Sequence, residues 1–381
     1  MTRRLAVVLA LALVLGACTR ETASTTTAAP SPSTSTTVAP TTTTTTAQVT
    51  TTTLPEPTWD ALPGIDALPQ EVQDELLALV RTTEEIRGLR FQEPPTISIV
   101  TEEELEQRVR AQIEEESDDF PADEALYKLL GLLEDDVNLQ LLLTDLYGEQ
   151  VAGYYDGETG ELVVPMREEG FSIVQRATMI HELTHALTDE RLGFHPVYTA
   201  MLDEERLDEA SAYQALIEGD ASMTELLFLQ TLTQREIGEF FAEALDIDTE
   251  ALDNAPMFIQ DSLIFPYDAG LAWVQDHYLR DQWATVNEAY ARMPDLPGST
   301  EQIITPSDYQ RDLPTSFDVT APSLPGYDLE RESVWGEFGF RIMIDQVLGE
   351  DVGVDAADGW GGDYYAQWFD GQNAALLIMF E

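Results

Sequence analysis

The chain has 381 residues, a single cysteine and a formal net charge of −52 at pH 7. This charge disfavours nucleic-acid binding and a purely electrostatic hold on anionic lipid, because phosphate groups attract a basic surface. A lone cysteine excludes an intramolecular disulfide framework, so the fold must rely on its core for stability.

The N-terminus has the pattern of an export signal. Arg3 and Arg4 precede an apolar run over residues 5–15, which is too short for a membrane-spanning helix of about 20 residues. The Leu-Gly-Ala-Cys sequence that ends at Cys18 resembles the lipobox of bacterial lipoproteins. That resemblance implies removal of residues 1–17 and a diacylglycerol on Cys18, which would anchor the protein at the extracytoplasmic face of a cell membrane or envelope. An ordinary signal peptide with a chance cysteine is the alternative.

Residues 18–58 are dominated by Thr, Ser, Ala and Pro. Such a segment has almost nothing to bury, so it cannot offset the entropy lost on folding. We expect a disordered linker there, and one folded domain over residues 59–381.

The first half of this domain has mixed patterns. Apolar spacing predicts a helix over 68–90, and alternation predicts a strand over 96–100. Thr101 and Glu104 form a capping box that opens a helix ending near residue 115. Turn signals between two β-prone runs predict a hairpin. The remaining elements expected here are helices over 122–133 and 135–147, followed by that hairpin over 151–164.

The second half is predicted to be largely helical. A hairpin of two strands, over 363–369 and 374–380, is expected to end the chain. The predominance of helices with a small sheet predicts an α+β fold. The helices expected in this half lie over 172–192, 203–233, 268–280, 281–293 and 333–348.

One stretch, Ile-His-Glu-Leu-Thr-His-Ala, contains the pattern HExxH. His181 and His185 are one helical turn apart, so their imidazoles share a face and can bind one Zn²⁺. Glu182 beside the first ligand is placed to accept a proton from water that the zinc acidifies. Two solvated histidines on a surface helix are the alternative, but Leu183 and Leu187 indicate that this helix packs on a core.

A catalytic zinc takes three protein ligands and keeps one open position. We expect Glu218 to be the third ligand, since the small residues beside it in Glu-Gly-Asp-Ala let its helix approach the HExxH helix. Glu209 is the alternative. The remaining histidines, His195 and His277, have no metal-like spacing.

HExxH followed by Glu-Gly-Asp-Ala resembles the gluzincin type of zincin metallopeptidases, in which a glutamate on the next helix is the third ligand. Other segments resemble exported bacterial metallopeptidase-like proteins, among them Trp335-Gly-Glu-Phe338 and Gly359-Trp-Gly-Gly-Asp363. The chain departs from their pattern at Thr305, where a histidine is expected, so any role of that histidine is absent here.

The resemblance implies a zincin-like fold, with the HExxH helix under a small twisted sheet. An extended peptide substrate would pair with an exposed edge strand of that sheet. We expect residues 154–164 to supply the edge, although a plain hairpin is an equal alternative.

Supporting roles are less specific. Asp189 and Asp220 are candidates to accept the second N–H of a metal-bound histidine. A donor to the oxyanion formed during peptide hydrolysis is also needed. The candidates for that donor are Tyr267, His277, Tyr309 and Asp363.

The sequence therefore predicts an extracytoplasmic, lipid-anchored zinc metallopeptidase that acts on peptides or proteins, with Glu182 as general base. One alternative is a non-catalytic envelope lipoprotein that uses the same scaffold for binding or assembly. Another is a zinc hydrolase of a non-peptide bond. Glu182 favours catalysis, because a structural zinc site takes four protein ligands and needs no base.

Overall fold

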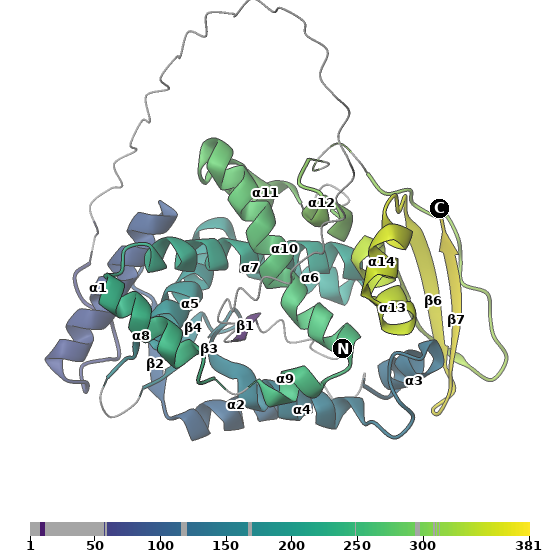
Figure 1. The fold of residues 1–381 in the computed structure, drawn as a ribbon, viewed down its shortest axis with the longest axis horizontal. Coiled ribbons are helices and arrows are strands. Elements are labelled where there is room, and N and C mark those ends of the chain that lie inside the picture. The colour runs from purple at the N-terminus through teal and green to yellow at the C-terminus, as the bar shows by residue number, and fades with distance from the viewer. Residues whose placement is uncertain are drawn as a thin grey trace, which may run out of the picture.

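The computed structural model describes residues 8–11, 57, 59–115, 120–166, 170–247, 249–293, 298–307, 309, 311 and 313–381. Cys18 lies outside these residues, as does most of the predicted signal peptide and linker. Helices dominate the described part and the strands form two small sheets, which confirms the α+β class (Figure 1). No helix among the described residues combines the length with the apolar character that a membrane-spanning segment needs.

The first sheet contains the predicted hairpin at its centre. Its strand order is β1 (Val8–Leu11), β3 (Val151–Asp156), β4 (Glu161–Pro165) and β2 (Thr96–Val100). The hairpin strands β3 and β4 are antiparallel, whereas β2 runs parallel to β4. The short strand β1, which falls within the predicted signal peptide, lies antiparallel along the outer edge of β3.

The helices of the first half agree with the predicted positions to within a few residues. The capping box is confirmed, since the backbone N–H of Thr101 donates to Glu104 and the N–H of Glu104 donates back to the Thr101 hydroxyl. These helices are α1 (Gln70–Arg87), α2 (Glu102–Glu115), α3 (Phe120–Leu130) and α4 (Leu139–Gln150).

The helix with the HExxH motif, α5 (Ile173–Leu192), begins at a capping box formed by Ser172 and Gln175. It ends at Gly193, whose φ of 71° is a conformation that glycine adopts without strain. Every residue from Met179 to Thr188 is buried, so the helix lies inside the molecule.

The single helix predicted over 203–233 is wrong at both ends. The chain forms α6 (Phe194–Asp203) and then a turn in which Glu205 takes a φ of 59°. This left-handed residue separates α6 from the longer α7 (Leu207–Leu229). Two further helices were not predicted, α8 (Gln234–Ala244) and α9 (Glu250–Asn254).

Helix α10 (Met257–Asp281) begins well before the predicted residue 268. Pro266 lies inside this helix. Proline is disfavoured in helix interiors because it has no N–H donor, so the sequence did not predict a helix through this residue. The short α12 and α14 were not predicted. The remaining helices are α11 (Ala284–Arg292), α12 (Thr300–Ile304), α13 (Gly336–Leu348) and α14 (Glu350–Ala357).

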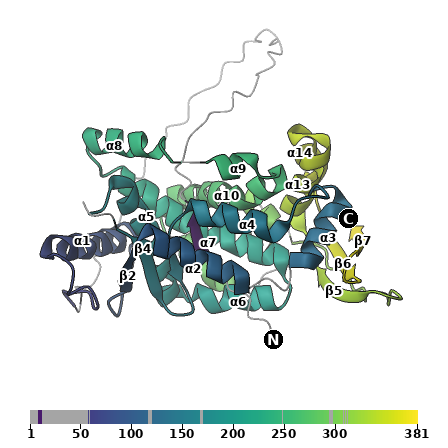
Figure 2. The ribbon, with the colours of Figure 1, turned by 90° about the horizontal axis from the view of Figure 1, so that it is seen from below.

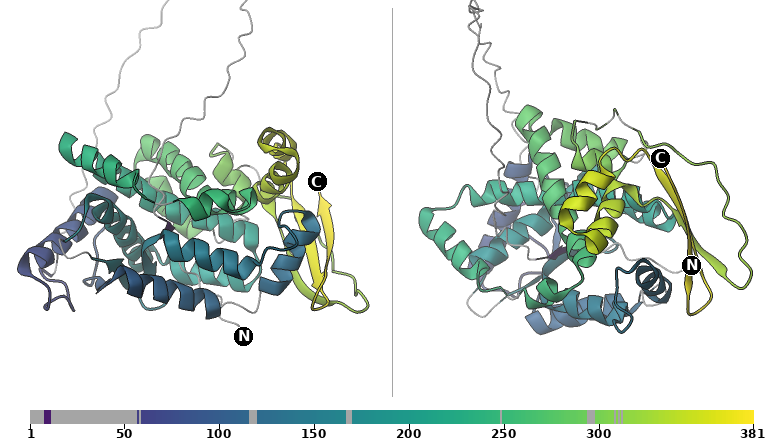
Figure 3. Two further views of the ribbon diagram at one scale, coloured as in Figure 1. Left: turned by 60° about the horizontal axis from the view of Figure 1, so that its bottom comes forward. Right: turned by 45° about the vertical axis from the view of Figure 1, so that its right-hand side comes forward.

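The second sheet consists of β5 (Asp328–Ser333), β6 (Asp363–Phe369) and β7 (Ala374–Phe380), all antiparallel with β6 in the centre. The hairpin of β6 and β7 has the predicted bounds. Strand β5 was not predicted, because its sequence Asp-Leu-Glu-Arg-Glu-Ser carries little apolar alternation. This sheet lies at the end of the molecule opposite α1 (Figures 1 and 2), with α13 and α14 beside it (Figure 3).

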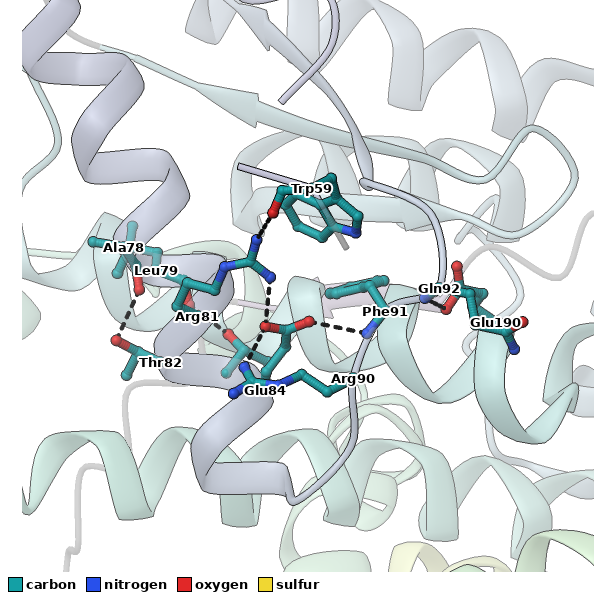
Figure 4. Close-up of polar contacts among 11 residues, drawn as sticks. Trp59, Ala78, Leu79, Arg81, Thr82, Glu84, Arg90, Phe91, Gln92 and Glu190 are labelled. Atoms are coloured by element: carbon teal, nitrogen blue, oxygen red, sulfur yellow. Dashed lines mark hydrogen bonds and ion pairs between the residues drawn. The ribbon is translucent and has the colours of Figure 1, made fainter. Parts of the chain in front are cut away.

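Two acidic side chains, the buried Glu84 and the exposed Glu190, fix the end of α1 to the rest of the fold (Figure 4). The carboxylate of Glu84 is fully buried and accepts hydrogen bonds from Arg81 at 2.8 Å, Arg90 at 2.6 Å and the backbone N–H of Phe91 at 3.0 Å. Glu190 of α5 accepts hydrogen bonds from the backbone N–H groups of Gln92 and Glu93, which follow Phe91 in the loop after α1. The loop after α1 is therefore held against the helix with the HExxH motif.

Another buried carboxylate, Asp208, fixes the first turn of α7. Its Oδ1 accepts hydrogen bonds from the backbone N–H of Thr300 at 3.1 Å and from the Thr300 hydroxyl at 2.6 Å. Burial raises the pKa of Asp208 to about 7. The folded protein therefore binds a proton that the unfolded chain releases at a lower pH.

We predict that Asp208→Asn removes a pH-dependent part of the stability. Because the pKa is higher in the folded state, its stabilising contribution is complete below the unfolded pKa near 4 and is lost as pH rises through about 7. The free energy of unfolding of the wild type, measured in urea relative to that of Asp208→Asn, should fall by about 2–3 kcal/mol between pH 4.5 and 8. A constant difference over this range would contradict the assignment.

Candidate metal centre

Helix α5 presents the two motif histidines on one face, as predicted. The ring centroids of His181 and His185 are 4.7 Å apart, and both side chains are buried. Glu182, between them in sequence, is also fully buried. The alternative of two solvated histidines on a surface helix is therefore wrong.

Helix α7 brings the predicted third ligand to this pair. The Oε2 of Glu218 lies 3.1 Å from Nε2 of His181 and 3.4 Å from Nε2 of His185. One ligand atom from each of the three residues lies within 4.8 Å of the other two, and all three residues are buried. Glu209, the alternative ligand, instead pairs with Arg206 near the start of α7, about 13 Å along the helix from Glu218.

A close contact between α7 and α10 sets the position of Glu218. A Cβ on Gly219 would lie 2.2 Å from the backbone of Gly270, and a Cβ on Gly270 would lie 2.0 Å from the carbonyl oxygen of Ala215. The two helices thus touch through their backbones. We expected from the sequence that the glycine beside Glu218 would allow close packing against the HExxH helix. That expectation is corrected, since Gly219 allows close packing against α10.

The four buried groups have unusual proton affinities. Burial raises the pKa of Glu182 to about 8 and lowers that of His185. Burial alone would raise the pKa of Glu218, but the two histidines outweigh this and lower it to about 2. Burial would likewise lower the pKa of His181, but Glu218 and a second glutamate raise it to about 10. Negative charge at Glu218 is therefore favoured, and so is a cation beside it.

Several atoms of the cluster lack the partners that buried polar groups normally have. Oε1 of Glu218, both ring nitrogens of His185 and both carboxylate oxygens of Glu182 have no hydrogen-bond partner among the described residues. Leaving such groups unsatisfied costs free energy. Imidazole nitrogens and a carboxylate that converge in this way can hold a metal ion, and such binding would satisfy one nitrogen of His185 and the carboxylate of Glu218.

The second glutamate near His181 is Glu225, a residue that was not predicted from the sequence. Its Oε2 lies 3.4 Å from Nδ1 of His181, the ring nitrogen that faces away from Glu218. Glu225 follows Glu218 by seven residues, or two helical turns, so both lie on one face of α7. That spacing is the only signal in the sequence, and in a chain with 71 acidic residues it is weak.

The two carboxylates expected beside the histidines have other partners. Asp189 accepts hydrogen bonds from the Tyr155 hydroxyl at 2.8 Å and from the backbone N–H of His195 at 2.9 Å, so it ties β3 and α6 to α5. Asp220 forms a fully buried ion pair with Arg87 of α1 at 2.6 Å. The predictions for Asp189 and Asp220 are therefore wrong.

Of the four candidate oxyanion donors, Tyr267 lies beside the metal centre. Its ring, on α10, is stacked at 6.0 Å from that of His181. His277 lies ten residues further along α10, about 15 Å away along the helix. There it packs with Tyr309 against Trp273.

Asp363 is also placed differently from what we expected. It accepts hydrogen bonds from the backbone N–H groups of Trp335 and Gly336, both at 2.9 Å, and from the Trp360 indole at 3.0 Å. These contacts join β6 to the start of α13. Asp363 therefore has a structural role at the second sheet.

No protein-family model matches the chain, and no curated protein is similar to it at a significant level. Among solved structures, the chain is similar to a candidate hydrolase with a novel fold from Chloroflexus aurantiacus, with a TM-score of 0.38 and 19% sequence identity. The similarity covers 62% of this chain and 88% of the other. A likeness this low carries no argument about function, which therefore depends on the geometry of the site.

We predict that Gly219→Ala weakens both the fold and the metal centre. The added methyl group would overlap the Gly270 backbone, so α7 and α10 must separate, and overpacking of this kind costs about 1–3 kcal/mol. The free energy of unfolding measured in urea should decrease. The affinity for zinc should decrease as well, because Glu218 moves with α7. Gly238→Ala in α8 is the matched control, since its Cβ would meet nothing within 4 Å. Equal stability of the two variants would show that the contact is not tight.

Proposed function

We propose that this protein is a zinc metallopeptidase in which His181, His185 and Glu218 bind the metal and Glu182 is the general base. The observation that carries this proposal is the buried His-His-Glu cluster with a second, unpaired carboxylate beside it. Neither a structural metal site nor a plain packing cluster needs that additional acid.

The spacing of the ligand atoms supports zinc. In a tetrahedral site with bonds of about 2.0–2.1 Å, neighbouring ligand atoms lie about 3.3 Å apart. Oε2 of Glu218 is 3.1 and 3.4 Å from the two imidazole nitrogens. Two histidines and one glutamate are also a typical catalytic set, which leaves one coordination position for water or substrate. When bound, zinc supplies Lewis acidity, which acidifies water and polarises a carbonyl group.

Glu182 has the properties of a proton acceptor that works near neutral pH. It is fully buried, its pKa is raised to about 8, and it follows His181 directly in the sequence. A carboxylate of this kind can take a proton from the attacking water and deliver it to the leaving amine. Tyr267, stacked beside His181, is the candidate to donate its hydroxyl to the developing oxyanion.

The position of β3 supports an extended peptide as the substrate. The strand packs beside α5, and its Tyr155 hydroxyl is bonded to Asp189 of that helix. The outer edge of β3 pairs with the extended segment β1, in a register that places Val8 opposite Tyr155. If residues 1–17 are removed on export, the same edge is left for a peptide to join as an additional strand. A plain hairpin with no ligand at its edge is the alternative.

We further propose that the mature protein is attached to the extracytoplasmic face of a cell membrane through a lipid on Cys18. The support is the sequence alone, namely the short apolar run and the small residues before the cysteine. The Thr-rich linker would then hold the folded domain away from the bilayer.

Glu182→Gln should retain the metal and lose hydrolysis. The amide has the shape of the acid but cannot accept the proton, so the rate should fall at least about 100-fold. Metal content would be measured on the purified protein, and cleavage would be followed by mass spectrometry on a mixed peptide library. Glu190→Gln on the same helix, whose carboxylate accepts backbone N–H groups of the loop after α1, is the control.

Cleavage by Glu182→Gln at the wild-type rate would reject the proposed mechanism. If the wild type binds zinc but cleaves no peptide in the library, the non-catalytic alternative is favoured instead.

Cys18→Ser should release the protein from the membrane fraction of the cells that express it. The hydroxyl cannot form the thioether to diacylglycerol, so the anchor is lost while the folded domain is unchanged. Immunoblots of membrane and soluble fractions measure this, with Thr19→Ser as the control. Continued membrane retention of Cys18→Ser would reject the lipid anchor.

A further inference from the structure

We propose that Glu225 positions His181 for metal binding, by accepting a hydrogen bond from Nδ1 of its ring. This inference rests on the proposed metal site. It assigns a role to a residue that belongs neither to the HExxH motif nor to the Glu-Gly-Asp-Ala segment.

The geometry separates the two nitrogens of His181. Nε2 lies 3.1 Å from Glu218, on the side of the ligand cluster, whereas Nδ1 lies 3.4 Å from Oε2 of Glu225. A shift of about half an ångström would bring the second pair to the usual hydrogen-bond length. A proton held on Nδ1 by Glu225 leaves the lone pair of Nε2 free for a metal.

The two histidines differ in this respect. Nδ1 of His185 has no hydrogen-bond partner in the part of the chain that the structure describes. Its ring is fully buried and packs against Phe194, with 6.2 Å between the ring centroids. Packing therefore orients His185, while a carboxylate orients His181.

Helix α7 supplies both the ligand and this carboxylate. Glu218 is fully buried, whereas the side chain of Glu225 two turns later is 24% exposed, which places it at the rim of the centre. A carboxylate at the rim keeps part of its hydration, so its placement there costs less free energy than the full burial of Glu218. Because both groups stand on one rigid helix, any movement of α7 changes the ligand and its orienting contact together.

The test compares zinc affinity in three variants of the full chain, by competition with a chromophoric chelator. Glu225→Ala should bind zinc about 10- to 100-fold more weakly than the wild type. Glu225→Gln keeps an oxygen that accepts from Nδ1, so it should recover most of the affinity. Glu209→Ala removes the same charge from the first turn of α7 and should leave the affinity unchanged.

The ¹⁵N spectrum of the zinc-loaded protein provides a second measurement. In the wild type and in Glu225→Gln, His181 should show a proton on Nδ1, and in Glu225→Ala that signal should broaden or shift. Thermal unfolding of the zinc-free proteins checks that the fold is intact, and the partly exposed position of Glu225 predicts little change.

Wild-type zinc affinity in Glu225→Ala would overturn the inference, and so would equal weakening in Glu225→Ala and Glu225→Gln. Neither result would affect the proposed function, provided that Glu182→Gln still abolishes hydrolysis. A wild type that binds no zinc would instead overturn both proposals.

Discussion

The carboxylate of Glu218 is fully buried and faces two imidazoles across the interface of α5 and α7. A buried negative charge is costly unless a cation compensates it. One protonated imidazole or one divalent metal ion can supply that positive charge, and the unpaired Nε2 of His185 and Oε1 of Glu218 are atoms that a metal ion could bind. The remainder of the structure can be understood as the support that keeps these groups together.

That support is concentrated on α7. Its backbone touches α10 at Gly219 and Gly270, and its Asp220 forms a buried ion pair with Arg87 of α1. At its first turn, Asp208 holds α12 through two hydrogen bonds from Thr300. Because α7 is fixed at its first turn and again directly beside Glu218, this glutamate has little freedom to leave the histidines. A catalytic centre benefits from such rigidity, since its ligands are in place before the substrate arrives.

The sequence predicted the parts that depend on local spacing. His181 and His185 follow from a separation of four residues on a helix, and the hairpins follow from their turn residues. Glu218 could be singled out because the small residues beside it indicate close helix packing. The start of the long predicted helix was placed four residues too early, because one left-handed residue, Glu205, decides where α7 begins.

Residues whose partners come from distant segments could not be assigned in this way. Asp220 was expected to orient a histidine, but its partner Arg87 lies 133 positions earlier in the chain. Asp189 similarly binds Tyr155 of a separate strand. Glu225 was overlooked since one more glutamate on an acidic helix carries no distinguishing pattern. Such pairings depend on tertiary packing, which periodicity does not encode.

The most direct test of the central claim is a crystal structure of the zinc-loaded protein with anomalous data collected at the zinc edge. We expect one peak bonded to Nε2 of His181, Nε2 of His185 and a carboxylate oxygen of Glu218, at about 2.0–2.2 Å, with a fourth position open to solvent near Glu182. A peak elsewhere in the molecule, or one closed by four protein ligands, would contradict it.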